Sequence, residues 1–123
     1  MIYYLIIPFV SYCLINETFV YYSAVMHWQE MRDSGKLNFK DDPVLVSICY
    51  WNLFKGLLLD TLLNWIVLTP VLCELPREFL TTARLCRWYN TIPTSRLDRW
   101  RLGVACWTKI RLDKVDPSGV HIK

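Results

Sequence analysis

The sequence predicts an all-α fold: an integral membrane helical hairpin with two spans, followed by C-terminal basic amphipathic helices. Three observations support this fold class. Of the 123 residues, 54% are hydrophobic and 15% are aromatic, and the mean hydropathy of +0.22 is too high for an ordinary soluble domain of this size. A short polar segment separates two long apolar runs. The chain that follows them is rich in arginine and tryptophan.

The first expected span covers residues 3–28. Tyr3 and Tyr21 lie near its two ends and are about 18 residues apart, which is roughly 27 Å in an α-helix. This length is close to the hydrocarbon thickness of a bilayer, and tyrosine is typical of both interfaces. Pro8 is tolerated in such a helix because neighbouring groups can satisfy the freed carbonyl. We therefore expect one continuous span with Glu17 as its only charge.

A polar loop at residues 29–42 is expected to join the first span to a second one, because this segment ends in an Asp-Asp-Pro sequence. The second span is expected at 43–65, with Pro43 in the first turn and one of the two preceding aspartates as its N-cap. A span at 57–73 is the alternative, and it would follow an interfacial helix that ends near Lys55.

Two prolines follow the second span and set the expected domain boundary. Pro70 and Pro76 are each expected to bend or end the helix that precedes them. The chain should thus divide into a membrane hairpin, 1–76, and a cytoplasmic or interfacial tail, 77–123. From residue 74 onward there are ten Lys or Arg residues against five acids. By the positive-inside rule, both termini are expected in the cytoplasm, with the short loop on the outer side of the membrane.

Polar side chains inside the two apolar runs form the first candidate site. This intramembrane polar face consists of Glu17, Asn52, Lys55, Asp60 and Asn64. Counted from the loop, Glu17 and Lys55 reach similar depths, so an ion pair across the hairpin is geometrically possible. A charge at mid-bilayer costs between about 2.5 and more than 10 kcal/mol, which favours pairing or neutralisation. Structural pairing and a proton or ion pathway both remain open.

The tail is expected to lie on the membrane surface as amphipathic helices at 77–89 and 95–112. The apolar stripe of the second helix, at positions i, i+3, i+7 and i+10, is Leu97, Trp100, Val104 and Trp107. The side chains expected at the membrane surface are Arg77, Arg84, Arg87, Trp88, Arg96, Arg99, Trp100, Arg101 and Trp107.

A polar elbow is expected where the tail leaves the bilayer. Glu78 should lie in the first turn of the helix that follows Pro76, where a carboxylate suits the positive end of the helix dipole. Glu74 and Glu78 are also placed to meet Arg77 or the arginines of the tail.

The sequence contains no pattern that predicts an enzyme. The five cysteines show no metal-ligand spacing, and no phosphate-binding loop, nucleophile elbow or Ser/His/Asp arrangement is present. We therefore expect no catalytic residues, no cofactor, no metal, no small-molecule substrate and no nucleic-acid partner. The expected partners are the lipid bilayer and either a host membrane protein or further copies of the chain.

Residues 60–88 carry a resemblance to a group of small membrane-associated proteins from tailed bacteriophages and prophages of Gram-negative bacteria. That group is typified by an Asp-x-x-x-Asn pattern, a Pro-Arg-Glu-Phe or Pro-Asp-Glu-Thr stretch, and a Thr/Ser-x-x-Ala-Arg stretch before a basic aromatic helix. The resemblance implies a phage origin and a membrane location, and no reaction. This chain differs by its additional N-terminal span and by an apolar stretch at 65–72. The matching positions are Asp60, Asn64, 76–79, 81–84 and 116–119.

The expected function is that of a phage-encoded accessory protein of the host inner membrane. It would bind and modulate a host envelope component, as in superinfection exclusion or envelope takeover, through the polar face at 52–64 with the tail as a second contact. A holin-like, oligomeric, pore-forming lysis protein is the first alternative. A virion-associated structural membrane protein is the second.

Overall fold

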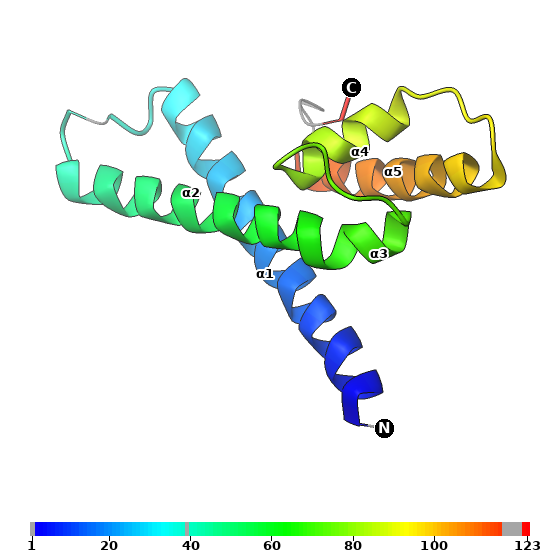
Figure 1. Cartoon of the computed structure of the whole chain (residues 1–123). Coiled ribbons are helices and arrows are strands. Elements are labelled where there is room, and N and C mark those ends of the chain that lie inside the picture. Colours follow the sequence, from blue (N-terminus) through cyan, green and yellow to red (C-terminus); the bar gives the residue numbers. More distant parts are fainter. Residues whose placement is uncertain (1, 39, 117–121) are drawn as a thin grey trace. The chain divides into compact units, whose positions relative to one another are not determined.

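The structure is a computed structural model that describes residues 2–38, 40–116 and 122–123. All regular elements among these residues are helices (Figure 1), which confirms the all-α class. Two continuous helical stretches, Ile2–Asp33 and Pro43–Leu72, are long and apolar enough to cross a membrane. In chain order the elements are α1 (Ile2–Asp33), α2 (Pro43–Leu63), the π-helix η1 (Asn64–Leu68), α3 (Thr69–Leu72), α4 (Thr81–Tyr89) and α5 (Arg96–Val115).

The chain divides into two compact units, Met1–Asp60 and Thr61–Lys123, which we call unit 1 and unit 2. The division lies inside a helix and precedes the boundary at residue 76 expected from the sequence. It falls there because the residues of η1 and α3 pack against α4 and α5. The last turns of the second apolar run thus belong structurally to the tail.

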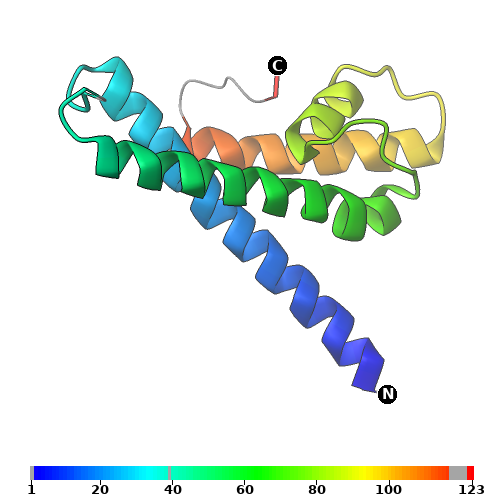
Figure 2. The same cartoon turned by 60° about the vertical axis from the view of Figure 1, so that its left-hand side comes forward.

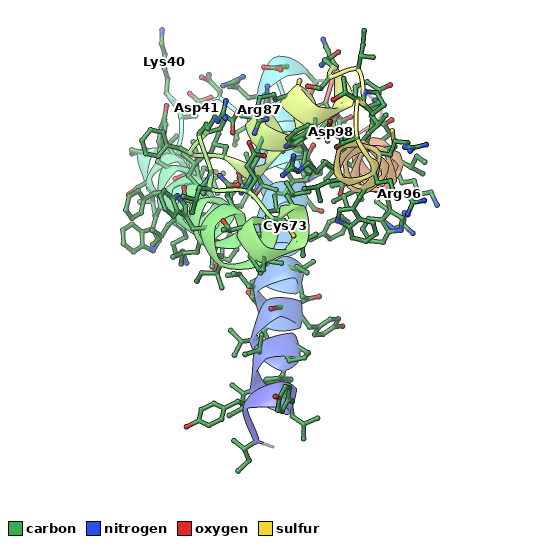
Figure 3. All side chains as sticks on the ribbon, turned by 45° about the vertical axis from the view of Figure 1, so that its right-hand side comes forward. Lys40, Asp41, Cys73, Arg87, Arg96 and Asp98 are labelled. Atoms are coloured by element: carbon green, nitrogen blue, oxygen red, sulfur yellow. The ribbon has the colours of Figure 1, made fainter. Side chains whose placement is uncertain are left out.

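Unit 1 contains two helices joined by a short connection. Helix α1 ends at Asp33, beyond residue 28, where the first span was expected to end. The chain then turns at Gly35, whose φ of 74° is accessible to glycine without strain. Lys40 projects from this connection (Figure 3). The Asp42 side chain accepts a hydrogen bond of 2.9 Å from the Leu45 amide. The expected aspartate cap with proline in the first turn of the helix is therefore confirmed.

Helices α1 and α2 meet where Tyr21 faces Gly56. A Cβ atom added to Gly56 would lie 3.3 Å from the Tyr21 Cβ, which is tighter than ordinary side-chain contact. The absence of a side chain at this position therefore allows the close approach. In the same region, the Lys55 ammonium nitrogen lies 5.3 Å from the centre of the Tyr21 ring and 5.9 Å from that of Trp51.

The second apolar helix does not end before Pro70, one of the two expected effects of the proline, and its geometry instead changes in the π-helix that precedes the proline. Helical structure continues through η1 and α3 to Leu72, and it ends at Cys73, which adopts a left-handed conformation with φ of 48°. Pro70 has no amide to donate, and its ring normally clashes with a preceding carbonyl. The wider turn of η1, just before the proline, accommodates both effects.

Unit 2 has a small apolar core between α3, α4 and α5, which lie side by side in Figures 1 and 2. Helix α4 buries Thr81, Arg84, Leu85 and Trp88, which lie on one helical face at spacings of i, i+3, i+4 and i+7. Helix α5 begins with a capping box in which the Ser95 hydroxyl accepts from the Asp98 amide at 3.1 Å. The buried apolar residues of the core are Leu68, Leu72, Leu85, Trp88, Ala105 and Ile122.

Candidate functional site

The centre of unit 2 is a fully buried arginine. Arg84 has no exposed surface, and its Nη1 donates to the backbone oxygen of Asn64 at 3.2 Å and to the side-chain Oδ1 at 3.1 Å. Its Nη2 donates to the Glu74 carbonyl. A buried charge is stabilised only when it is well hydrogen-bonded. Here, oxygens from η1 and from the segment after α3 bind Nη1 and Nη2, whereas the buried Nε has no partner among the described residues.

Asn64 links the same two segments from the other side. It is also fully buried, and its Nδ2 donates to the carbonyls of Glu78 at 2.6 Å and Phe79 at 3.2 Å. Asn64 and Arg84 together therefore bind main-chain oxygens near both ends of residues 73–80. We call this segment the elbow loop.

Two carboxylates of the elbow loop are paired with α4. Arg87 contacts Glu78 through Nε at 2.5 Å and both oxygens of Glu74 through Nη2 at 3.0 and 3.1 Å. Trp88 Nε1 donates to Glu74 at 2.8 Å, and Arg77 approaches the same carboxylate at 3.9 Å. The expected pairing of both glutamates with arginines is therefore confirmed. Glu78 precedes α4 and is not in its first turn, because the helix starts at Thr81.

The charges in this network are fixed by their surroundings. Burial disfavours the charged form of Glu74, but the hydrogen bonds from Arg87 and Trp88 outweigh it, so the Glu74 pKa lies below its ordinary value of 4.5. Burial also lowers the pKa of Arg84 below its ordinary value, yet arginine stays protonated at neutral pH. For Arg87, burial is opposed by its hydrogen bonds to the two glutamates, and its pKa is raised.

Helix α5 closes the carboxyl end of α3. Trp100 Nε1 donates to the Val71 carbonyl at 2.7 Å, and Arg101 donates to the carbonyls of Leu72 at 2.8 Å and Cys73 at 3.1 Å. The last carbonyls of a helix have no partners within it, and a cation there also suits the helix dipole. Arg101 is held in place by Asp98 at 3.2 Å.

These bonds hold the backbone and the carboxylates of the elbow loop against unit 2 and leave its other side chains exposed. Glu74 and Glu78 turn toward α4, whereas the alternate residues Leu75 and Phe79 are 74% and 79% exposed and the Arg77 side chain is 78% exposed. A loop tied by its own backbone and carboxylates has little freedom to collapse over these side chains. It therefore presents two apolar groups and one cation in a fixed arrangement.

The expected intramembrane polar face is not assembled as a unit. Within the described residues no ion pair joins Glu17 to Lys55, because the contact of Tyr21 with Gly56 displaces the register by about one helical turn. Asn52 donates to the carbonyl of Ile48 in its own helix at 2.8 Å. Asp60 is half-buried. Asn64 is buried within unit 2, so its expected place on the intramembrane polar face is corrected.

The residues expected at the membrane surface fall into two groups. Arg84 and Trp88 are buried and Arg87 binds within unit 2, because α4 turns these side chains toward α3 and the elbow loop. Arg101 of α5 also binds within unit 2, at the carboxyl end of α3. Val104 of the expected apolar stripe likewise packs against the core. The exposed members are Arg77, Arg96, Arg99, Trp100 and Trp107.

The buried pair of Asn64 and Arg84 was not predicted as a pair from the sequence. The signal was nevertheless present, because the positions that carry the phage-protein resemblance include Asn64, 76–79 and 81–84, and these build the network. The matching stretch 116–119 lies outside the described residues after Asp116. No cluster of side chains suited to a metal ion occurs in the part of the chain that the structure describes.

Comparisons of the chain with protein-family models, curated proteins and solved structures find no match. The resemblance to small phage membrane proteins therefore stays a prediction from the sequence motifs.

Proposed function

We propose that the chain is a non-enzymatic, phage-encoded accessory protein of the bacterial inner membrane that binds and modulates a host envelope component. The observation that carries this proposal is the elbow loop, whose exposed Leu75, Arg77 and Phe79 are held in place by buried polar bonds beneath them. A preorganised apolar and cationic surface suits protein recognition, because little conformational freedom is lost on binding.

The membrane location is supported by α1. Every residue from 2 to 10 is exposed and most are large and apolar, and none of the described residues of α1 is buried. Lipid provides the burial that the rest of unit 1 does not supply. A helix of this length and composition is explained more simply by a bilayer than by the core of a soluble domain.

The burial of residues in η1 and α3 supports one of the two alternative positions of the second span, 43–65 and 57–73. Asn64, Val67, Leu68 and Leu72 are covered within unit 2, so this face of the stretch packs against protein and is not available to lipid. Helix α2, with 21 residues, spans roughly 31 Å and is sufficient to cross the hydrocarbon layer by itself. We therefore propose the span at 43–65, with unit 2 at the cytoplasmic surface and both termini on that side.

The sequence alone placed the partner contact on the polar face at 52–64, and we now propose the elbow loop in its place. Asn64 is enclosed and Asn52 is satisfied by its own helix, which leaves that face with few groups to offer. Leu75 and Phe79 lie shortly after the second span in the chain, so a partner would meet them at the membrane surface. An integral or peripheral envelope protein fits this position.

The experiment expresses the chain in a Gram-negative host and measures the plating efficiency of challenge phages. Wild type should lower the efficiency of phages that depend on the bound component, and Leu75→Ser with Phe79→Ser should restore it. Both side chains are exposed, so the double variant should reach the membrane at the wild-type level. Ile92→Ser is the matched control, because Ile92 is 84% exposed in the same unit and lies outside the loop.

Membrane potential, read with a voltage-sensitive dye in the same cells, separates this proposal from the holin-like alternative. An accessory protein should leave the potential intact. An abrupt collapse on expression of the chain alone would replace the proposal with the pore-forming one.

A further inference from the structure

Helix α5 has two apolar faces, and only one of them packs into the core of unit 2. On the other face, the indole nitrogen of Trp100 donates to the Val71 carbonyl, but its ring stays exposed. The inner face of α5 packs Val104, Ala105 and Leu112 against the core. Its outer face carries Trp100, Trp107 and Ile110, which are 56%, 57% and 58% exposed. These three residues follow the spacing i, i+7 and i+10 and form one stripe along the helix. The solvent face of a soluble helix is normally polar, so this stripe indicates a second contact surface.

The charges around the stripe are all positive. Arg96, Arg99 and Lys114 form no ion pair among the described residues, and Arg96 projects outward from the start of α5 (Figure 3). Arg111 lies over the Trp107 ring at 3.5 Å. The acids of the helix are turned elsewhere: Asp98 binds the N-terminal cap and Arg101, and Asp113 binds Lys109 at 3.0 Å.

We infer that this outer face of α5 binds the anionic phospholipid surface of the bilayer. In this arrangement Trp100 and Trp107 lie at the level of the headgroups, where tryptophan is preferred, and Ile110 lies beside them. The flanking arginines and Lys114 contact lipid phosphates, and each cation near an anionic surface strengthens binding. The inference rests on the proposed membrane location and is independent of any host protein.

Charge complementarity favours lipid over a second copy of the chain. Two copies joined through this face would bring the cations of one against the cations of the other, since no free acid is present among its described residues. Like charges placed together disfavour such an interface. An anionic bilayer meets both the cations and the aromatic stripe without this repulsion.

The experiment uses the full chain, purified and reconstituted in vesicles of equal parts phosphatidylglycerol and phosphatidylcholine. A photoreactive phenylalanine analogue replaces Trp107, and mass spectrometry identifies the adducts formed on illumination. We expect lipid adducts with a several-fold excess of phosphatidylglycerol. The analogue at Asp113, on another side of the same helix, is the matched control and should give few lipid adducts.

Charge variants test the chemistry of the contact. Arg99→Gln with Lys114→Gln should bring the ratio of phosphatidylglycerol to phosphatidylcholine adducts down toward about one. Lys109→Gln removes the same kind of charge from the Asp113 side and should leave the ratio unchanged.

The outcomes are distinguishable from a failure of the proposed function. Adducts to a second copy, no lipid adducts at position 107, or no preference for phosphatidylglycerol would each overturn the inference, while flotation of the chain with the vesicles would still support the membrane location. A chain that does not float with the vesicles would overturn the membrane location as well. No host protein is present, so the result does not depend on a partner.

Discussion

Arg84 donates to both the backbone oxygen and the side-chain oxygen of Asn64, across 20 positions of the sequence. This pairing joins the end of an apolar helix to the face of α4. It also leaves the Asn64 amide nitrogen free to bind the elbow loop. The position of the loop thus depends on a charge that is fully enclosed.

The first prediction concerns that charge. Arg84→Met keeps much of the side-chain volume but leaves the oxygens of Asn64 and the Glu74 carbonyl without their donor. Each buried acceptor left without a donor costs about 1–3 kcal/mol, so unit 2 should lose much of its stability. Hydrogen exchange of the α4 and α5 amides in detergent measures the loss. Arg77→Met, at a side chain 78% exposed, should change protection by less than about 0.5 kcal/mol, and equal protection in both variants would contradict the role of Arg84.

Local sequence patterns were sufficient to predict much of the helical framework. The polar segment after the first apolar run, Pro43 with an aspartate before it, and the basic aromatic stretch beginning near Ser95 each carry their information within a few residues. Such signals act through backbone propensity and capping, which do not require knowledge of the tertiary fold.

The centre of unit 2 could not be predicted in the same way. A charged residue is expected at the surface unless its partners are known, and the partners of Arg84 lie in segments that the sequence assigns to a different domain. Counting residues from the loop also failed to predict how Glu17 and Lys55 lie relative to each other. That count assumes a register between the two helices which the close contact at Gly56 changes. The helix does not end before Pro70 because the π-helix just before the proline accommodates its ring and its missing amide.

The second prediction is a dependence of unit 2 on pH. The Glu74 pKa is lower in the folded state than its ordinary 4.5, so the carboxylate contributes stability that is fully present above pH 4.5 and is lost as the pH falls through the folded pKa. Hydrogen-exchange protection should be constant from pH 7 to about pH 5, after correction for intrinsic exchange, and then decline.

Glu74→Gln tests the assignment of this dependence. The variant should be less stable at neutral pH, because it loses the ionic contacts to Arg87, and its stability should fall less steeply in acid. The remaining decline reflects Asp98, whose pKa is lowered by hydrogen bonds from Thr94 and Ser95. A decline as steep as in the wild type would assign the acid sensitivity to other groups.

The third prediction concerns the contact between α1 and α2. A Cβ at Gly56 already lies 3.3 Å from Tyr21, so Gly56→Ile should force the helices apart. Spin labels at positions 12 and 58 of a cysteine-free variant should show a longer or broader distance distribution after the change. Gly103→Ile is the control, because nothing lies within 4 Å of a Cβ there. An unchanged distribution with Gly56→Ile would mean that the helices do not meet at this point.

The fourth prediction concerns the penultimate residue. Ile122 is only 2% exposed and belongs to the core of unit 2, and the carbonyl of Lys123 next to it accepts hydrogen bonds from Cys86 and Asn90. Ile122→Ala should cost about 2–4 kcal/mol through lost burial and the cavity it leaves. The same substitution at Ile92, which is 84% exposed, should have almost no effect. Hydrogen exchange of the α4 amides compares the two variants, and a core that tolerates Ile122→Ala as well as Ile92→Ala would show that the C-terminus does not pack there.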